Sequence, residues 1–403
     1  MTSEPFSAKA EQIRSLVDQY TLATYRRSKV LSHGKGSYVW DVDGFKYLDL
    51  SGGVAVNCLG HAHPAIVEAL QKQASQLIHI SNHFYHESAG LLAKQLVDLT
   101  GPGRIFFCNS GAEANELFYK LVRKFGHETG RYEIITALDS FHGRTLAGIA
   151  ATGQEKVRKD FEPVIPGFSH VPFNDLSALE QAITPRTAAV LIEGIQGEGG
   201  ITCATADYLI GVRRLTKDKN LLLGIDAIQC GFFRTGCFQS YERILENHSR
   251  KHEFLPDVIS MAKSLGGGFP MGAVWLHDSV QGLIDTGSHG TTFGGSPLAC
   301  AVSLAVLDVI KKENLAKNIR QQGERLMNGL RKLAQTKPIA DVRGLGGMVG
   351  LEVKGDVAEA REKLAEGGLL FVPSGRNTLR FLPPLNVSAH EIDEALEIVE
   401  KYL

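Results

Sequence analysis

The sequence predicts an α/β protein with a large, doubly wound domain built on a mixed sheet and a smaller α+β domain. Between residues 100 and 275, short apolar runs of strand type alternate with helix-like segments, as in sheets covered by helices on both faces. After residues 289–297 the pattern changes to two long helices, three short strands and a last helix. A chain of 403 residues is also long enough for two domains.

The predicted domain boundaries follow this change of pattern. Residues 1–48 form an N-terminal segment that joins the small domain, residues 49–290 form the large α/β domain, and residues 291–403 form the C-terminal small α+β domain. In the N-terminal segment, residues 8–25 have a helical pattern. Residues 38–50 indicate a hairpin, because Asp43-Gly44 is a strong two-residue turn signal.

Further elements are predicted from periodicity and from the residues that cap helices. Pro64 opens a helix that extends to about residue 77. Ser388 and Glu391 form a capping box at the start of the last helix. Strands are expected at 104–109, 132–136, 187–193, 221–226, 258–262, 347–353, 369–372 and 378–382, and helices at 110–123, 208–217, 298–310 and 315–333. Residues 240–253 form a charged, helix-like insertion with no chemical signal.

Composition excludes several classes of function. The protein has 43% hydrophobic and 22% charged residues, which is ordinary for a globular protein. Its formal net charge of −1 provides no positive electrostatic field that would attract nucleic acid or an anionic membrane. Its six cysteines have no CxxC spacing, which indicates neither a zinc site nor a disulfide framework. No apolar run reaches about eighteen residues, the length of a spanning helix. Residues 1–20 carry Glu4, Glu11 and Asp18 and lack a secretory pattern. We expect a cytoplasmic protein.

Lys263 and Asp226 each follow a short apolar run of strand type. The carboxyl ends of parallel strands meet at one edge of a sheet, where ligands bind, so both side chains can share a pocket. A lysine with an ordinary pKa near 10.4 is a free amine only about once in a thousand at neutral pH, and desolvation raises that fraction. Pyridoxal phosphate requires a lysine for its aldehyde and a carboxylate for its ring nitrogen. The alternative is a surface lysine and a turn aspartate.

Ser110 and Gly111 stand where a predicted strand passes into a helix. Free N–H groups and the helix dipole make such a turn an anion site, although Ser110 with Glu113 also forms an ordinary capping box. In the loop after residues 132–136, Phe141 suits ring stacking and Arg144 suits carboxylate binding.

Five histidines raise the alternative of a metal site: His61, His63, His79, His83 and His86. No HExxH pattern is present, and residues 81–85 interrupt a helical face, so polar loop histidines are the better interpretation and no metal site is predicted. The glycines at 344–347 do not form a dinucleotide fingerprint, because they lie between a helix and a strand in the wrong order.

Taken together, the motifs resemble the class III (omega-amino acid) aminotransferases of pyridoxal phosphate fold type I, and most closely the N-acetylornithine aminotransferases. The resemblance extends from about residue 34 to residue 403. It rests on GVAVNCLGH (53–61), FCNSGAEANE (107–116), FHGRT (141–145), IQGEGG (195–200), AKSLGGGFP (262–270) and HGTTFGG (289–295). Six motifs in order make the surface-lysine alternative remote.

This resemblance implies roles for the cofactor residues. Lys263 would form the Schiff base with pyridoxal 5'-phosphate and then move a proton. Asp226 would pair with the ring nitrogen and Gln229 would lie near the phenolic oxygen. The remaining residues expected to bind the cofactor are Ser110, Gly111 and Ala112 at the phosphate, Phe141 stacked on the ring, and Thr292 from the neighbouring subunit of a homodimer.

The resemblance also implies a substrate site. Arg144 and Arg380 would bind the two carboxylates of glutamate or 2-oxoglutarate. Glu198 would pair with Arg380 while an omega-amine is bound, and Tyr25 is also assigned to substrate binding. Ornithine aminotransferases carry a tyrosine at the position of Gly53, so its absence here argues against free ornithine.

Three further positions depart from the family pattern: Ala227 replaces a glutamate beside the cofactor, Gly194 replaces a proline, and the insertion at 240–253 is long. The predicted function is transfer of the terminal amino group of N-acetylornithine to 2-oxoglutarate, a step of arginine biosynthesis. The alternatives are succinylornithine, 4-aminobutyrate or another omega-amine as donor, or a non-catalytic regulatory protein of this fold. No sequence motif indicates which acyl group the enzyme accepts.

Overall fold

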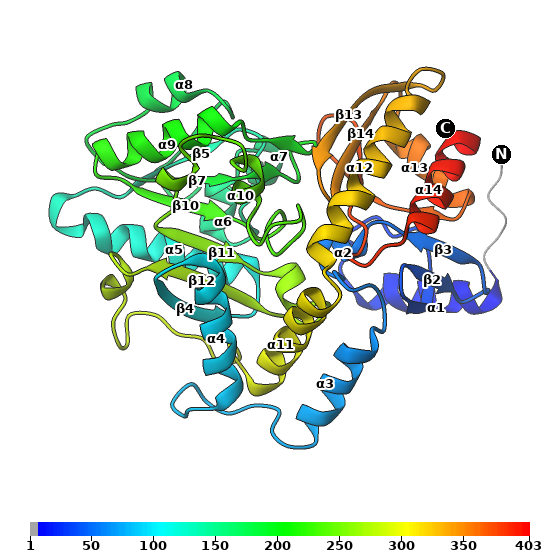
Figure 1. Cartoon of the computed structure of the whole chain (residues 1–403), viewed down its shortest axis with the longest axis horizontal. Coiled ribbons are helices and arrows are strands. Elements are labelled where there is room, and N and C mark those ends of the chain that lie inside the picture. Colours follow the sequence, from blue (N-terminus) through cyan, green and yellow to red (C-terminus); the bar gives the residue numbers. More distant parts are fainter. Residues whose placement is uncertain (1–6) are drawn as a thin grey trace.

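A computed structural model describes residues 7–403. Its largest feature is a seven-stranded sheet at the left of Figure 1. The strand order across this sheet is β4 (Gly103–Cys108), β12 (Gly272–His277), β11 (Val258–Met261), β10 (Leu222–Asp226), β7 (Thr187–Glu193), β5 (Glu133–Ala137) and β6 (Phe168–Val171). Only β12 runs against its neighbours, so the sheet is mixed.

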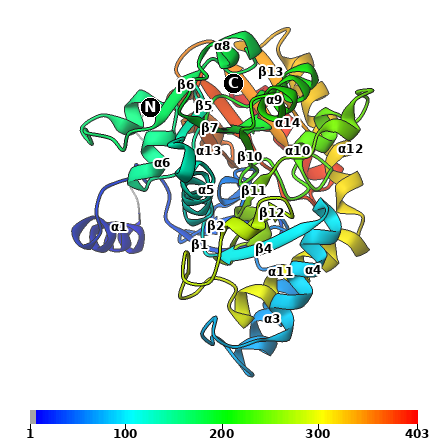
Figure 2. The same cartoon turned by 90° about the vertical axis from the view of Figure 1, so that its left-hand side faces the viewer.

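Both faces of this sheet are buried, because successive side chains of each strand point to opposite sides. In β7, Ala189 and Leu191 pack with α5 and α6, whereas Val190 and Ile192 pack in the core that includes α4 and α9. Figure 2 shows α5 on one side of these strands and α9 on the other. The helices of this part are α4 (Glu87–Thr100), α5 (Gly111–Gly126), α6 (Leu146–Ala151), α7 (Glu155–Arg158), α8 (Leu176–Gln181), α9 (Ala206–Asp218) and α10 (Ser240–Ile244).

Two smaller sheets lie at the right of Figure 1. One has the order β13 (Ile339–Leu345), β14 (Met348–Val353), β17 (Thr378–Phe381) and β16 (Val372–Ser374); the other has β1 (Leu31–Lys35), β2 (Tyr38–Asp41), β3 (Lys46–Asp49) and β15 (Leu369–Leu370). Because β3 from the N-terminal segment pairs with β15, the two ends of the chain share a sheet. This pairing supports the predicted assignment of the N-terminal segment to the small domain, of which residues 1–6 lie outside the described part.

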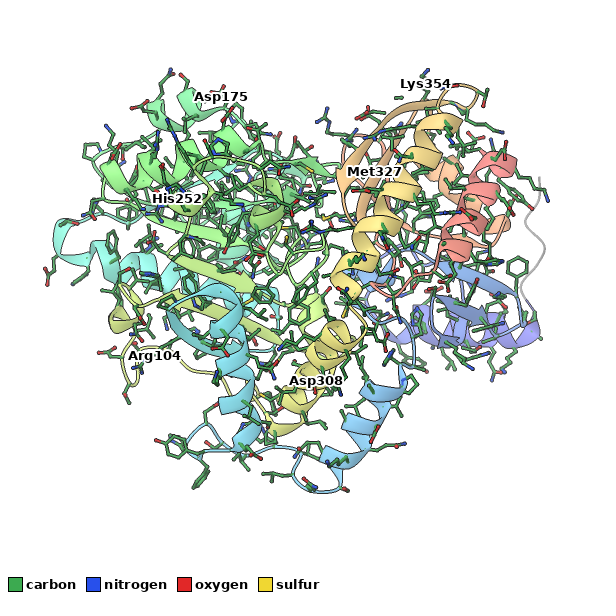
Figure 3. All side chains as sticks on the ribbon, in the orientation of Figure 1. Arg104, Asp175, His252, Asp308, Met327 and Lys354 are labelled. Carbon is green, nitrogen blue, oxygen red and sulfur yellow. The ribbon has the colours of Figure 1, made fainter. Side chains whose placement is uncertain are left out.

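Helices complete the two halves. They are α1 (Ala8–Tyr20), α3 (Pro64–Ala74), α11 (Pro297–Lys312), α12 (Leu315–Leu333), α13 (Val357–Glu366) and α14 (Ala389–Tyr402), with the single turn α2 (Gly52–Ala55) and the two-residue strands β8 (Ile195–Gln196) and β9 (Thr202–Cys203). In Figure 3, Asp308 marks α11 below the seven-stranded sheet and Met327 marks α12 beside the small sheets. The last helix begins with the predicted capping box of Ser388 and Glu391.

Four predicted elements differ in detail. The strand expected at 369–372 is two strands in different sheets, because the chain leaves β3 after Leu370 and joins β17 at Val372. The N-terminal helix ends at Tyr20, where the amide and hydroxyl of Thr21 both bond to the Val17 carbonyl.

The hairpin loop between β2 and β3 is longer than two residues, with Gly44 at φ 86°. The insertion at 240–253 contains only α10 and a three-residue 3-10 turn.

Among residues 7–403, no helix is long and apolar enough to cross a membrane. The same residues contain no group of three or more His, Cys, Asp or Glu side chains arranged to hold a metal ion. His61 instead bonds to Asp49, with 2.8 Å between Nε2 and Oδ2.

Candidate active site

A cavity of about 420 Å³ opens at the carboxyl ends of β7, β10 and β11 and at the start of α5. This is the edge of a parallel sheet at which ligands bind. Nine of the residues predicted from the sequence line it: Ser110, Gly111, Ala112, Phe141, Arg144, Glu198, Asp226, Gln229 and Lys263.

One end of the cavity is formed by the first turn of α5. Ser110 caps the helix by accepting a hydrogen bond from the Glu113 amide at 3.2 Å, and the first intrahelical bond reaches back from Ala114 to the Ser110 carbonyl. The amides of Gly111 and Ala112 precede that bond, so they are free to bind an anion. A Cβ at Gly111 would lie 2.6 Å from the Ile228 side chain, which explains the glycine. The cap and the anion site therefore coexist.

The carboxylate of Asp226 is buried and held by three donors. Oδ2 lies 2.8 Å from Nδ1 of His142 and 2.8 Å from Nδ2 of Asn115, and Oδ1 accepts the Ile228 amide at 3.1 Å. Only 3% of Asp226 is exposed. These bonds fix the carboxylate in place.

Lys263 stands opposite, immediately after β11, with a left-handed backbone at φ 50°. Burial and then the charge of Arg380 lower its pKa to about 8, against the opposing effects of Glu198 and Asp226. At neutral pH roughly one such lysine in ten is a free amine, compared with about one in a thousand for an exposed lysine. This is the property required of a Schiff-base lysine.

The short turn α2 ties Lys263 to the strand that carries Arg380. Its four residues all have φ between 51° and 63°, which is strained for Val54 and Ala55. The Ala55 carbonyl accepts the Ser264 hydroxyl at 2.8 Å, and a Cβ at Gly52 would lie 2.7 Å from the Leu382 carbonyl. The turn thus packs against both the Lys263 loop and the end of β17.

Arg380 on β17 is buried and paired. Its Nη1 lies 2.6 Å from Oε1 of Glu198 and 2.9 Å from Oε1 of Gln229, and it also donates to the Gly197 carbonyl at 2.8 Å. Burial would raise the pKa of Glu198, but Arg380 and then Lys263 outweigh this and hold it below its ordinary value. Glu198 therefore covers Arg380 as a charged partner.

Arg144 presents the opposite case. It is exposed, lines the cavity, and has no acidic partner within residues 7–403. Its guanidinium carbon lies 5.5 Å from the centroid of the Phe141 ring. This arginine is available to an incoming carboxylate without displacing another group.

Comparison with known proteins identifies the family. A profile described as "Aminotransferase class-III" matches residues 23–403. The chain belongs to the class-III aminotransferases. Enzymes of this class depend on pyridoxal 5'-phosphate, and this chain is therefore a pyridoxal-phosphate-dependent aminotransferase.

Relatives and solved structures agree with this assignment. The chain is 45% identical over 393 residues to the acetylornithine aminotransferase of Methanocaldococcus jannaschii, covering 96% of each chain. The ornithine aminotransferase of Toxoplasma gondii has a TM-score of 0.91 at 33% identity, covering 97% of this chain and 94% of that one. The N-acetylornithine aminotransferase of Stenotrophomonas maltophilia has a TM-score of 0.81 at 35% identity, covering 96% and 97%. The fold is that of pyridoxal phosphate fold type I.

The cavity of this aminotransferase fits the cofactor. The free amides of Gly111 and Ala112 suit its phosphate, the fixed carboxylate of Asp226 suits a protonated ring nitrogen, and Lys263 is a reactive amine. The side chains of Phe141 and Gln229 stand between these ends and complete the lining.

Three predicted residues of the aminotransferase do not line this cavity: Arg380, Thr292 and Tyr25. Arg380 is buried and contacts the lining residues Glu198 and Gln229. Thr292 lines a second cavity, of about 320 Å³, together with Glu113, Glu116 and His289. Tyr25 is 78% exposed and does not line the main cavity. Thr292 and Tyr25 are therefore outside the lining of the main cavity of their own chain.

Three residues at the site were not predicted: Asn115, His142 and Glu193. Asn115 is fully buried on α5 among apolar neighbours, and a buried amide on an apolar helix face is a signal that sequence alone could have provided. Ala227, expected beside the cofactor, is instead absent from the cavity lining and buried in the core, where its Cβ lies 2.9 Å from the position of a Cβ at Gly231.

Proposed function

We propose that this aminotransferase moves the terminal amino group of N-acetylornithine to 2-oxoglutarate, giving N-acetylglutamate semialdehyde and glutamate in arginine biosynthesis. The observation that carries the proposal is that Arg144 lines the cavity while Arg380 lies next to it, bonded to the lining residue Glu198. Arg144 is open, whereas Arg380 is neutralised by Glu198 at 2.6 Å. Such a site can take a donor with one carboxylate and, after Glu198 moves, an acceptor with two.

The reaction exchanges an amine and a carbonyl and needs no external oxidant. The carbon that loses nitrogen ends as an aldehyde, and the keto carbon of 2-oxoglutarate ends as the amine of glutamate. Bound pyridoxal phosphate supplies an aldehyde that accepts the amino group and a ring that withdraws electrons. Lys263, with its lowered pKa, moves the proton at the reacting carbon, and Asp226 keeps the ring nitrogen protonated.

In the donor half of the reaction, Arg144 would bind the single carboxylate of the acylated ornithine. The Glu198–Arg380 pair then presents a neutral surface to the chain near the amine, since an unpaired buried arginine there would be costly. In the acceptor half, the second carboxylate of 2-oxoglutarate would replace Glu198 on Arg380. Gln229 remains bonded to Arg380 and limits its movement.

The names of the relatives support N-acetylornithine, since the relatives from Methanocaldococcus jannaschii and Clostridium acetobutylicum are both acetylornithine aminotransferases. Free ornithine is the second candidate, because solved ornithine aminotransferases reach a TM-score of 0.91. Gly53 favours the acylated donor: it is exposed at φ 61° and has no side chain that could contact the free α-amino group.

The first test is the visible spectrum of the purified holoenzyme with each donor and no 2-oxoglutarate. We expect N-acetylornithine to bleach the cofactor band at a lower concentration than ornithine, succinylornithine or 4-aminobutyrate. A band that responds only to another donor would refute N-acetylornithine and retain the aminotransferase. Absence of a cofactor band after reconstitution would refute the assigned role of Lys263.

We propose further that the enzyme is a cytoplasmic homodimer in which Thr292 reaches the cofactor phosphate of the other subunit. The support is that Thr292 is absent from the cavity of its own chain and lies at a second cavity near the start of α5. Mixing and refolding K263A and T292A chains tests this. A hybrid keeps one intact composite site, so activity should return, whereas no recovery would contradict a shared site.

The same proposal includes the predicted domain boundaries and a role for Tyr25 in binding the amino donor. Tyr25 is 78% exposed and outside the cavity of its own chain, so any contact with substrate requires the other subunit. Tyr25→Phe should raise the KM for N-acetylornithine in the dimer if Tyr25 contributes to substrate binding.

A further inference from the structure

Glu193 is a buried carboxyl group to which the transamination chemistry assigns no role. It is the last residue of β7, and its backbone is paired in register with that of Asp226 on β10. It lines the main cavity and is only 6% exposed. Two acidic side chains therefore leave adjacent strands at the same edge of the sheet and face the same space.

The two carboxyl groups have very different partners. Asp226 accepts hydrogen bonds from His142, Asn115 and the Ile228 amide at 2.8 to 3.1 Å. Glu193 interacts only with backbone amides, that of Phe141 at 3.4 Å and that of Gly197, and within residues 7–403 it forms no ion pair. Asp226 is therefore the more fully hydrogen-bonded of the two carboxyl groups.

None of the basic side chains that reach the cavity forms an ion pair with Glu193 within residues 7–403. Arg380 donates to Glu198, Gln229 and the Gly197 carbonyl. His142 is directed through Nδ1 at Asp226. A second buried carboxylate beside Asp226 would have no ion-pair partner among residues 7–403, and buried carboxyl groups in that situation hold their proton. Burial, followed by the charge of Asp226, raises the pKa of Glu193 well above its ordinary value.

We propose that Glu193 is a positioning residue that acts as an uncharged carboxylic acid. Its accepting oxygen holds the Phe141 amide, and therefore the loop whose aromatic ring is expected to stack on the cofactor. Its O–H remains a donor for an acceptor atom in the cavity. Of the two acidic side chains at the ends of β7 and β10, only Asp226 then carries a negative charge. The proposal rests on the proposed function for the identity of the bound cofactor.

Four charged groups reach the same cavity from other elements, and each constrains this assignment. Asp226 is the last residue of β10, Lys263 comes after β11, Glu198 comes after β8, and Arg144 lies in the loop before α6. Because Glu198 is covered by Arg380, it can be charged without opposing Asp226. Glu193 has no such cover, so the two glutamates that line one cavity are expected in opposite charge states.

The test compares Glu193→Gln with Glu193→Ala in the cofactor-bound enzyme, without any amino donor. Glutamine retains the neutral, hydrogen-bonding side chain, so E193Q should titrate its visible cofactor band within about 0.3 pH units of wild type. E193A loses the contact with Phe141 and should show weaker cofactor binding by about tenfold. E198Q is the matched control: it removes a charged group, and the titration should move by about one unit or more toward lower pH.

Infrared difference spectra of wild type minus E193Q provide an independent measurement that needs neither cofactor nor substrate. We expect the carbonyl stretch of a protonated carboxyl at neutral pH, lost in E193Q. A carboxylate signal instead, or an E193Q titration displaced as far as that of E198Q, would overturn the proposal. If no cofactor band forms in wild type, the proposed function fails, while the infrared result still decides the charge of Glu193.

Discussion

The two ends of the catalytic cavity are built on different principles. At the Asp226 end, a buried carboxylate is fixed by His142, Asn115 and a backbone amide. At the Arg380 end, a buried guanidinium is covered by Glu198, whose side chain is 29% exposed. We propose that the first end keeps one charge for the cofactor. We propose that the second exchanges Glu198 for a substrate carboxylate, as an enzyme with two different substrates requires.

Lys263 lies between these ends, and its removal should have the largest effect. Lys263→Ala deletes both the amine and the proton carrier, so kcat should fall by at least about 10⁴-fold. Steady-state assays with N-acetylornithine and 2-oxoglutarate measure this fall. Circular dichroism of the variant controls for folding, and activity within tenfold of wild type would remove Lys263 from the mechanism.

Substitution of Asp226, at the fixed end of the cavity, should have the next largest effect. Asp226→Asn removes the charge but preserves the shape, and the loss of one member of a buried pair costs about 3–5 kcal/mol. A fall in kcat for both half-reactions by about 100-fold or more is expected, with equal loss for glutamate and N-acetylornithine. A loss confined to one substrate would show that this end also discriminates between substrates.

The pH dependence of pyridoxal phosphate uptake by the apoenzyme tests the pKa of Lys263. Burial and Arg380 lower its pKa to about 8, so the reactive free amine increases as pH rises toward that value. The rate at which apoenzyme takes up pyridoxal phosphate should rise about tenfold per pH unit below 8 and level off above it. Stopped-flow absorbance measures the rate. A rise that continues to pH 10 would mean that Lys263 has an ordinary pKa.

The smallest effect is expected from a substitution at Ala227. Ala227 follows Asp226 in the chain, but its side chain packs in the core rather than in the cavity. Ala227→Ser should change kcat/KM by less than about twofold and lower stability by about 1 kcal/mol through a buried hydroxyl. A change in the preferred donor would contradict this placement.

Sequence reasoning succeeded where a local pattern determines the structure. Short apolar runs predicted β10 and β11 and placed Asp226 and Lys263 at one edge, because parallel strands align their carboxyl ends. Ser110 was predicted as a cap from its own neighbours, and it caps α5. The predicted substrate roles of Arg144 and Arg380 depended on the family resemblance, since an arginine on a strand has no local signature.

The remaining features depend on long-range contacts that no local pattern records. β12, which lies between the edge strand β4 and β11 and is antiparallel to both, was not predicted, because the direction of a strand is set by its partner strands. Ala227 was placed beside the cofactor because adjacent residues of a turn cannot be assigned to the cavity or the core without the fold. Glu193 appeared as an ordinary strand end until its register with Asp226 was known.

The most direct test of the contrast between the two ends is Glu198→Ala, measured separately in each half-reaction by single-turnover absorbance. Without Glu198, Arg380 is an unpaired cation that suits glutamate and opposes the uncharged chain of N-acetylornithine. We predict that the rate with N-acetylornithine falls about tenfold or more while the rate with glutamate is unchanged or rises. An equal fall with both substrates would contradict a movable Glu198 and make the Arg380 end as fixed as the Asp226 end.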